Sequence, residues 1–377
     1  MEELPKAKGD TPLAKIGQLF SGLSQGLSQG LAFGGSTTAV GLSIGSSSIK
    51  IAELQKKGKT WKLLHFGVFQ LPEDAIVNRE IVNQVAVTES LRTLVSQIRL
   101  KNKNVCISLS GNALIIKRMQ LEVPNLKELQ EQVFWEAEQY LPFDVGDVVM
   151  DYHMLSRVEN TTDVLFVAVK NAYLDSYMSC VSDMGLKPKI VDTDFFALQN
   201  VFELNYPPNP SKSVALIDIG ASSFKFVVVH DGVPVFQKDV AIGGRSLTTE
   251  IQRNLDLSYL DAETLKVSGQ GSTMPQEVSD LMQVMADNLA LEAKKAIDFY
   301  NASSVGAPIE FILLAGGSAK IPNLSKAIED ATLLPTQNFN PFNAITCDPT
   351  IFTQDYLNAI APIAVIPIGL ALRAAAK

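Results

Sequence analysis

The clearest pattern in the chain is an apolar segment interrupted by a short polar turn, and it occurs twice. Residues 40–51 read VGLSIGSSSIKI, and residues 216–226 read LIDIGASSFKF. In each copy a run of β-branched residues turns through glycine and small hydroxyl residues and resumes as a strand, which predicts a β-hairpin. Aligning Gly45 with Gly220 also aligns the lysine that follows each turn. The repeat therefore predicts two similar halves.

Hydrophobic periodicity predicts helices and strands along the rest of the chain. Steps of three and four between apolar residues predict helices over residues 81–97, 125–141, 173–184, 261–267, 275–301 and 322–330. Short apolar runs predict strands over residues 105–109, 114–123, 148–155, 164–169 and 189–192, and one more that begins at 311. Strands that alternate with helices indicate an α/β protein whose sheets are covered by helices.

The most apolar stretch lies at the C-terminus, over residues 360–372. It is shorter than the ~18 apolar residues that a membrane span needs. It also contains Pro362 and Pro367, and proline is tolerated best in the first turn of a helix. The pattern predicts a buried terminal helix with one of these prolines near its start.

Composition narrows the class of protein. The chain has 377 residues, of which 46% are hydrophobic and 19% charged, so it can bury more than one core. Its net charge of −8 disfavours nucleic acid as a partner. Cys106, Cys180 and Cys347 are far apart, which predicts neither disulfides nor a zinc site and favours a reducing cytoplasm. The N-terminus lacks a signal-peptide pattern, so export is not expected.

Residues 1–38 differ from the rest because they are rich in glycine, serine and glutamine. Such a composition is typical of a flexible tail. The alternative is a helix that forms only against a membrane or a partner, because apolar residues recur at steps of three and four. These apolar residues are Leu13, Ile16, Phe20, Leu23, Leu27 and Leu31. Three prolines within residues 206–212 predict a linker farther along the chain.

The two polar turns and a third glycine turn at residues 315–318 carry the candidate chemistry. Backbone N–H groups in such turns can hold phosphate, and glycines let the backbone approach a flat base. Asp218 could hold a hydrated magnesium ion. Glu263 and Lys266 could reach a ribose, or they form a surface ion pair. The candidate binding residues are Ser43, Gly45, Ser46, Ser47, Ser48, Lys50, Asp218, Gly220, Ala221, Ser222, Ser223, Gly243, Gly244, Glu263, Lys266, Gly316, Gly317, Ser318 and Ile321.

These motifs resemble those of the actin-like ATPase superfamily. GLSIGSSS at residues 41–48, DIGASS at 218–223 and LAGGSAKIPN at 314–323 look like its phosphate-1, phosphate-2 and adenosine motifs. WEAEQYLPF at residues 135–143 and GLKPKIVD at 185–192 are similar to the PilM family of type IV pilus assembly proteins, as is the ending GLALR. The resemblance runs from about residue 39 to the C-terminus.

The resemblance implies a duplicated actin-like (ribonuclease H-like) two-domain α/β fold with an FtsA-like inserted subdomain. The implied divisions are a tail over residues 1–38, domain I over 39–206 with an insert near 111–163, a linker over 207–212, domain II over 213–346, and a segment over 347–377 that returns to domain I. It further implies ATP and Mg²⁺ as cofactors.

The resemblance also implies partners. The N-terminal peptide of PilN would bind in a groove between domain I and the insert, with residues 114–138 in one wall. Through PilN the protein would be linked to PilO, PilP and the pilus motor ATPases, at the cytoplasmic face of the inner membrane. A ring or another homo-oligomer is compatible with this role.

Ser43 departs from the superfamily pattern, which usually has aspartate there. Without that acid, holding magnesium and the attacking water becomes harder, so slow or absent ATP hydrolysis is expected, with Asp218 as the remaining catalytic acid. Asp192 or Asp194 could replace the missing acid, or could cap the helix that follows. An FtsA-like polymer-forming cytoskeletal protein and a sugar-kinase-type phosphotransferase remain alternatives to a scaffold.

Overall fold

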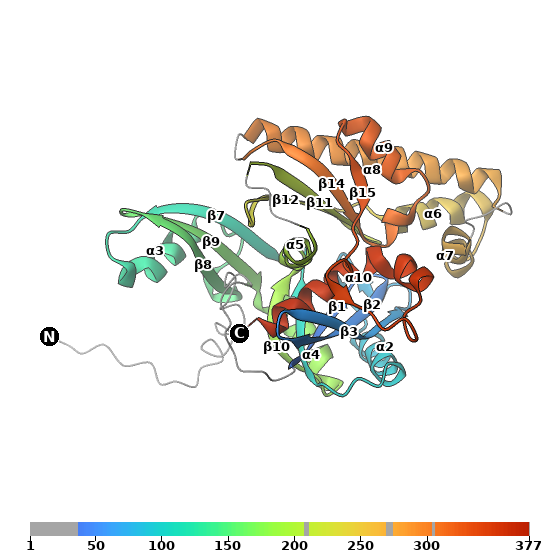
Figure 1. Cartoon of the computed structure of the whole chain (residues 1–377), viewed down its shortest axis with the longest axis horizontal. Coiled ribbons are helices and arrows are strands. Elements are labelled where there is room, and N and C mark those ends of the chain that lie inside the picture. Colours follow the sequence, from blue (N-terminus) through green and yellow to red (C-terminus); the bar gives the residue numbers. More distant parts are fainter. Residues whose placement is uncertain (1–36, 207–210, 269–273, 304–305, 377) are drawn as a thin grey trace.

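The computed structural model describes residues 37–206, 211–268, 274–303 and 306–376. Nearly all of the predicted N-terminal tail and part of the predicted linker lie outside these residues. The described chain contains two large sheets with helices between and around them, and a smaller sheet to one side (Figure 1).

The first large sheet is built around the first of the two repeated hairpins. In spatial order its strands are β10 (Lys187–Thr193), β6 (Asn104–Leu109), β1 (Thr37–Ile44), β2 (Ser48–Lys57), β3 (Thr60–Gln70) and β16 (Ile345–Thr346). β2 is antiparallel to both of its neighbours, β1 and β3, while β6 and β10 run parallel to β1. The predicted hairpin at residues 40–51 is therefore formed by β1 and β2.

The second large sheet repeats this arrangement. In spatial order its strands are β15 (Thr336–Asn338), β14 (Ile309–Ala315), β11 (Ser213–Ile219), β12 (Phe224–His230) and β13 (Val233–Val240). β12 is again antiparallel to both of its neighbours, β11 and β13, and β14 and β15 again run parallel to β11. Equal strand order and equal strand directions in both sheets confirm the predicted duplicated α/β fold.

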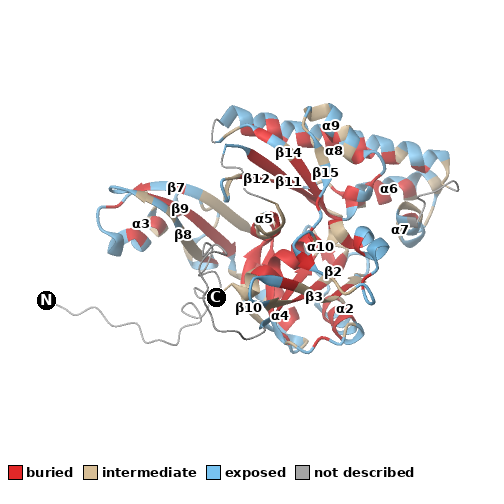
Figure 2. Ribbon diagram, in the orientation of Figure 1, coloured by how far each residue is buried: buried red, intermediate tan, exposed pale blue. Residues whose placement is uncertain are grey.

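Two helices lie between the sheets and join their cores (Figure 1). They are α5 (Asp194–Asn205) and α10 (Gln354–Ala375). The outer faces are covered by α2 (Gln84–Gln97) and α4 (Asn171–Asp183) on the first sheet and by α6 (Gly244–Leu255), α8 (Gln276–Ser303) and α9 (Leu324–Thr332) on the second, with α7 (Tyr259–Ser268) beside α6. Figure 2 shows buried residues concentrated on the sheets and on α10, whereas the outer side of α8 is exposed.

α10 corrects one sequence prediction. Both Pro362 and Pro367 lie inside the helix, not near its start, which is capped by Thr353. An interior proline costs roughly 3 kcal/mol, but burial of the apolar side chains on both sides outweighs that cost here. The carbonyl oxygen of Pro362 accepts a hydrogen bond from the Gly316 N–H. By length and composition α10 could span a membrane, yet 67% of its most apolar window is buried inside the protein.

The small sheet is inserted between β6 and α4. Its strands, in spatial order, are β7 (Leu114–Glu122), β9 (Thr161–Lys170) and β8 (Val148–Val158). α3 (Leu129–Glu138) covers one face with an apolar core of its own. Short elements complete the chain: β4 (Ile76–Val77), β5 (Glu80–Ile81), η1 (Leu126–Glu128), η2 (Val145–Asp147) and η3 (Gly317–Lys320).

Candidate functional site

The turns of the two repeated hairpins face each other at the carboxyl ends of β1 and β11. In each turn the glycine N–H donates to a serine carbonyl: Gly45 to Ser48 at 3.0 Å, and Gly220 to Ser223 at 2.8 Å. The hydroxyl groups of two further serines, one from each turn, meet across the gap, since Ser46 Oγ and Ser222 Oγ are 2.6 Å apart. The twin turns therefore form the two walls of one cleft.

Each turn has a lysine that reaches back toward it. Lys50 Nζ donates to Ser48 Oγ at 2.8 Å, and Lys225 Nζ donates to Ser223 Oγ at 3.0 Å. By strand register Lys50 lies opposite Ser43, whereas Lys225 lies opposite an acid, Asp218. The two hairpins thus share a conformation and a cation but differ in the residue that faces the cation.

The cleft suits an anion. Three cationic side chains and two carboxylates line it: Lys50, Arg79, Lys225, Asp194 and Asp218. Burial lowers the pKa of Lys50, with the charge of Asp218 acting against this effect. A negatively charged ligand would relieve that cost, and free N–H groups in the turns would add hydrogen bonds. The cavity volume of the cleft is only about 80 Å³, so a nucleotide could enter only after the walls separate.

Two predicted acids at the junction of β10 and α5 lie in different environments. Asp194 lines the cleft, and its Oδ2 lies 3.1 Å from Lys225 Nζ. Burial opposes ionisation of Asp194, but Lys225 and the Ser108 hydroxyl outweigh it and lower its pKa. Asp192 instead lies outside the cleft lining, 2% exposed, with Oδ2 3.7 Å from Arg373 Nε. Of the two aspartates that could replace the missing acid, the structure therefore places Asp194, and not Asp192, in the cleft lining.

The glycine turns of the second half pack directly on the second phosphate turn. A Cβ on Gly316, whose φ is +91°, would lie 2.3 Å from the Ile219 carbonyl oxygen, and a Cβ on Gly243 would lie 2.5 Å from the Gly220 carbonyl oxygen. The Ser318 hydroxyl donates to that same Gly220 oxygen at 3.0 Å. Only glycine allows this close approach of three turns.

The remaining predicted residues fall into two groups. The cleft lining contains Ser43, Gly45, Ser46, Ser47, Lys50, Asp218, Gly220, Ala221, Ser222, Ser223, Gly316 and Gly317. Outside it lie Ser48, Gly243, Gly244, Ser318, Ile321, Glu263 and Lys266. The last two are paired at 2.5 Å, and Lys266 Nζ also donates to the carbonyl oxygen of Gly244 at 3.2 Å. This pair therefore holds α7 against the start of α6.

Sequence reasoning missed a contact that closes the cleft. Arg79, in the turn between β4 and β5, donates two hydrogen bonds of 2.6 Å to the carboxylate of Asp239 on β13. Arg245 adds a hydrogen bond of 2.9 Å to the Ser46 carbonyl oxygen. Both contacts join residues far apart in sequence, and no local pattern predicts them. The sequence indicates only the turn itself, because Asn78, a residue type common in tight turns, comes directly before Arg79.

A protein-held magnesium ion does not fit the acids of this cleft. Among the described residues no group of three His, Cys, Asp or Glu side chains could hold a metal ion. The Asp218 carboxylate already accepts from Lys225 Nζ at 3.2 Å. A divalent ion on that oxygen would lie within about 5 Å of the ammonium group, where repulsion amounts to roughly 7 kcal/mol at an effective dielectric constant of about 20.

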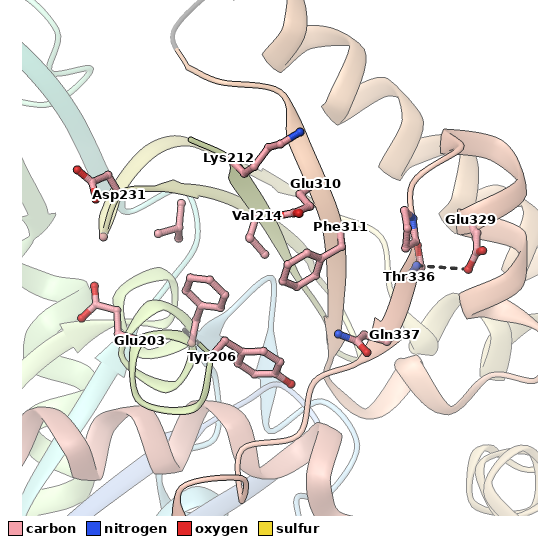
Figure 3. Close-up of a pocket in the computed structure, with 14 residues that line it drawn as sticks. Glu203, Tyr206, Lys212, Val214, Asp231, Glu310, Phe311, Glu329, Thr336 and Gln337 are labelled. Atoms are coloured by element: carbon pink, nitrogen blue, oxygen red, sulfur yellow. Dashed lines mark hydrogen bonds between the residues drawn. The ribbon is translucent and has the colours of Figure 1, made fainter. Parts of the chain in front are cut away.

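A larger cavity, of about 1070 Å³, lies between the end of α5 and the ends of the second-sheet strands that are farther from the cleft. Figure 3 shows Glu203 and Tyr206 on one side of it and Val214 and Phe311 on the other. Lys212 is the one cation in its lining, beside four carboxylates. Such a lining disfavours phosphate, so the smaller cleft is the candidate nucleotide site.

Comparison with known proteins agrees with the fold and the motifs. The family model for the type IV pilus assembly protein PilM matches residues 41–375. A structure of the PilM-PilN type IV pilus biogenesis complex is similar at a TM-score of 0.80 and 25% identity, over 90% of this chain and 98% of that chain. The ethanolamine utilization protein EutJ from Carboxydothermus hydrogenoformans shares the fold, at a TM-score of 0.56 and 13% identity over 89% and 90% of the two chains. The chain therefore belongs to the PilM family of type IV pilus assembly proteins.

Proposed function

We propose that the protein is an ATP-binding scaffold of the type IV pilus machine that binds the N-terminal cytoplasmic peptide of PilN. The observation that carries this proposal is the likeness, over 90% of the chain, to a structure of the PilM-PilN complex. Through PilN the scaffold would couple PilO and PilP to the motor ATPases at the cytoplasmic face of the inner membrane. A ring or another homo-oligomer would suit such a coupling role.

Nucleotide binding rests on the cleft between the twin turns. The turns offer backbone N–H groups to phosphates from two sides, and Lys50 has no ion-pair partner within 4 Å among the described residues. Hydrolysis is expected to be slow because Ser43 supplies no charge opposite Lys50. Magnesium, expected at Asp218, would compete there with Lys225, so the proposal takes ATP without a metal ion held by the protein.

The peptide site is proposed at the junction between the inserted sheet and the end of α10. There Asp151, on β8, and Asp192, on β10, each have one buried carboxylate oxygen without a hydrogen-bond donor in the described part of the chain. Arg373 influences both, since its charge lowers their pKa values against the larger raising effect of burial. Peptide N–H groups would satisfy these two oxygen atoms.

β8 adds backbone groups to the same junction. It is an edge strand that pairs only with β9 among the described strands, so its outer side could accept an extended peptide as a further strand. The opposite edge strand, β7, is engaged elsewhere, because Gln237 of the second sheet donates to the Ile116 carbonyl oxygen at 3.0 Å. This asymmetry favours β8 over the expected wall at residues 114–138.

The division of the chain into domains is part of the proposal. Domain I comprises residues 39–206, with its insert near residues 111–163. The linker comprises residues 207–212, and domain II comprises residues 213–346. Supporting this division, β10 and α5 end the first half before the linker, and β11 begins the second sheet. The return to domain I starts slightly earlier than residue 347, because Ile345 pairs with Trp61 of β3.

Peptide binding tests the proposal directly. Fluorescence polarisation with a labelled N-terminal peptide of the cognate PilN should give saturable binding to the full chain. Arg373→Gln should weaken it at least tenfold, because the charge that organises both carboxylates is lost. Lys294→Gln, which also replaces a cation with glutamine but on the exposed side of α8, should leave it unchanged. A folded Arg373→Gln protein with unaltered affinity would contradict the proposed site.

A further inference from the structure

The second hairpin holds a buried ammonium group among oxygen atoms. Lys225 Nζ lies 3.1 Å from Asp194 Oδ2, 3.2 Å from Asp218 Oδ2 and 3.0 Å from Ser223 Oγ, and its side chain is only 7% exposed. An ammonium group has three hydrogen atoms to donate, so these three oxygens satisfy it completely. Asp194 comes from the first half of the chain and Asp218 from the second, so the cation joins the two walls of the cleft.

Lys50 shows what the same position looks like without acids. It occupies the equivalent place in the first hairpin and donates to Ser48, but Ser43 stands opposite it. Within the described residues Lys50 forms no ion pair, whereas Lys225 forms two. The two lysines therefore differ in role: Lys50 is available to a phosphate, and Lys225 is paired with two carboxylates.

The carboxylates of the cleft have little capacity left for a metal ion. Asp194 Oδ1 accepts from the Ser108 hydroxyl at 2.5 Å, and its Oδ2 faces Lys225. Asp218 Oδ2 faces the same ammonium group. A magnesium ion coordinated directly by Asp218 Oδ2, at about 2.1 Å, would have to displace that buried cation. Burial alone would lower the pKa of Lys225, but the two carboxylates outweigh it and raise the pKa, so the group is charged.

We propose that the Lys225 ammonium group is the resident cation of the phosphate cleft, so that a nucleoside triphosphate binds without a divalent metal ion held by the protein. The inference rests on the nucleotide-binding part of the proposed function. It predicts that nucleotide affinity depends weakly on magnesium, which distinguishes this cleft from one whose acids coordinate the ion. The lysine and the two aspartates act as one ion-paired unit that positions the turn at residues 220–223.

The test starts without nucleotide. Lys225→Met keeps an unbranched side chain that is one atom shorter and removes its charge, which leaves Asp194 and Asp218 facing each other. Mn²⁺ titration followed by electron paramagnetic resonance should show one site on this variant, and Mg²⁺ should raise its melting temperature. The wild-type protein and Lys50→Met, the same change in the first hairpin, should show neither effect. Lys225→Gln replaces the methionine variant if that variant does not fold.

The second readout is nucleotide affinity measured by calorimetry. ATP affinity of the wild-type protein should change less than threefold between Mg²⁺ and EDTA, while Lys225→Met should lose at least tenfold in EDTA. Wild-type affinity that falls tenfold in EDTA, or Mn²⁺ binding by the wild-type protein, would overturn the inference and leave the scaffold proposal standing. No ATP binding under either condition, with Mn²⁺ binding by Lys225→Met, would overturn nucleotide binding and leave the cation assignment standing. No Mn²⁺ binding by either folded Lys225 variant would overturn that assignment.

Discussion

The ion pair between Arg79 and Asp239 should stabilise the closed form of the cleft. It joins the hairpin of β4 and β5 in the first half to β13 in the second, through two hydrogen bonds of 2.6 Å, with side chains that are 13% and 16% exposed. Exposed pairs contribute about 0–1 kcal/mol, and breaking a fully buried pair costs about 3–5 kcal/mol. Partial burial and bidentate geometry place this pair between those limits, at about 2 kcal/mol.

The Arg79–Asp239 ion pair should slow the entry of nucleotide. A cleft of about 80 Å³ cannot admit ATP unless the walls separate, so association depends on the open population. About 2 kcal/mol corresponds to roughly a 30-fold change in the equilibrium between closed and open forms. Asp239→Asn should therefore raise the association rate constant of a fluorescent ATP analogue by up to roughly 30-fold in stopped-flow experiments. A double-mutant cycle with Arg79→Gln should give the coupling energy from urea unfolding.

A matched control uses another aspartate in an ion pair. Asp298 lies 4.0 Å from Lys294 on α8, with both side chains about half exposed, and Asp298→Asn should change the unfolding free energy by less than about 0.5 kcal/mol. It should leave nucleotide association unchanged. The reasoning would be refuted by an Asp239→Asn protein that loses stability as expected but binds nucleotide at the wild-type rate. In that case the pair stabilises the fold without holding the cleft closed.

Three further predictions address pH, packing and catalysis. Burial raises the pKa of Asp192 to about 6, above the ~3.9 of an unfolded aspartate, so the free energy of unfolding falls progressively between about pH 4 and pH 6 and stays lowered above that range. Asp192→Asn should therefore leave the urea unfolding free energy unchanged below about pH 4 and raise it by up to about 3 kcal/mol at pH 7.5. A Cβ on Gly41 would lie 1.9 Å from the α10 backbone, so Gly41→Ala should cost more than about 3 kcal/mol, whereas Gly146→Ala, in open space, should be nearly neutral. Ser43→Asp places a carboxylate opposite Lys50 and should raise phosphate release at least tenfold in a colorimetric assay; no increase would show that this acid is not the missing part.

The fold was predictable because its main signal is local and repeated. The turns at Gly45 and Gly220 carry the same sequence pattern, and both hairpins formed at the predicted places. Apolar residues at steps of three and four also predicted most helices within a few residues of their observed bounds. Pro362 and Pro367 were misjudged because tertiary burial outweighed a local preference, an effect that sequence pattern does not report.

The site was predictable only in part. The spacing of glycine and serine predicts turns whose backbone N–H groups can bind phosphate. The contact between Arg79 and Asp239, in contrast, arises from tertiary folding alone. Asp192 and Asp194 stand two residues apart at a junction of strand and helix, so no periodicity decides which of them faces the cleft. The repeat aligns Lys225 with Lys50, but the contacts of Lys225 with Asp218 and Asp194 became visible only in the structure.

Calorimetric titration of the full chain with the N-terminal peptide of its cognate PilN, with and without ATP, tests the central claim most directly. A scaffold gated by nucleotide should bind one peptide per chain, with an affinity that differs between the two conditions, because ATP would shift the equilibrium between the closed and open forms of the cleft. The difference should disappear in a variant that does not bind ATP. Absence of peptide binding in both conditions would contradict the account and return the polymer and phosphotransferase alternatives to consideration.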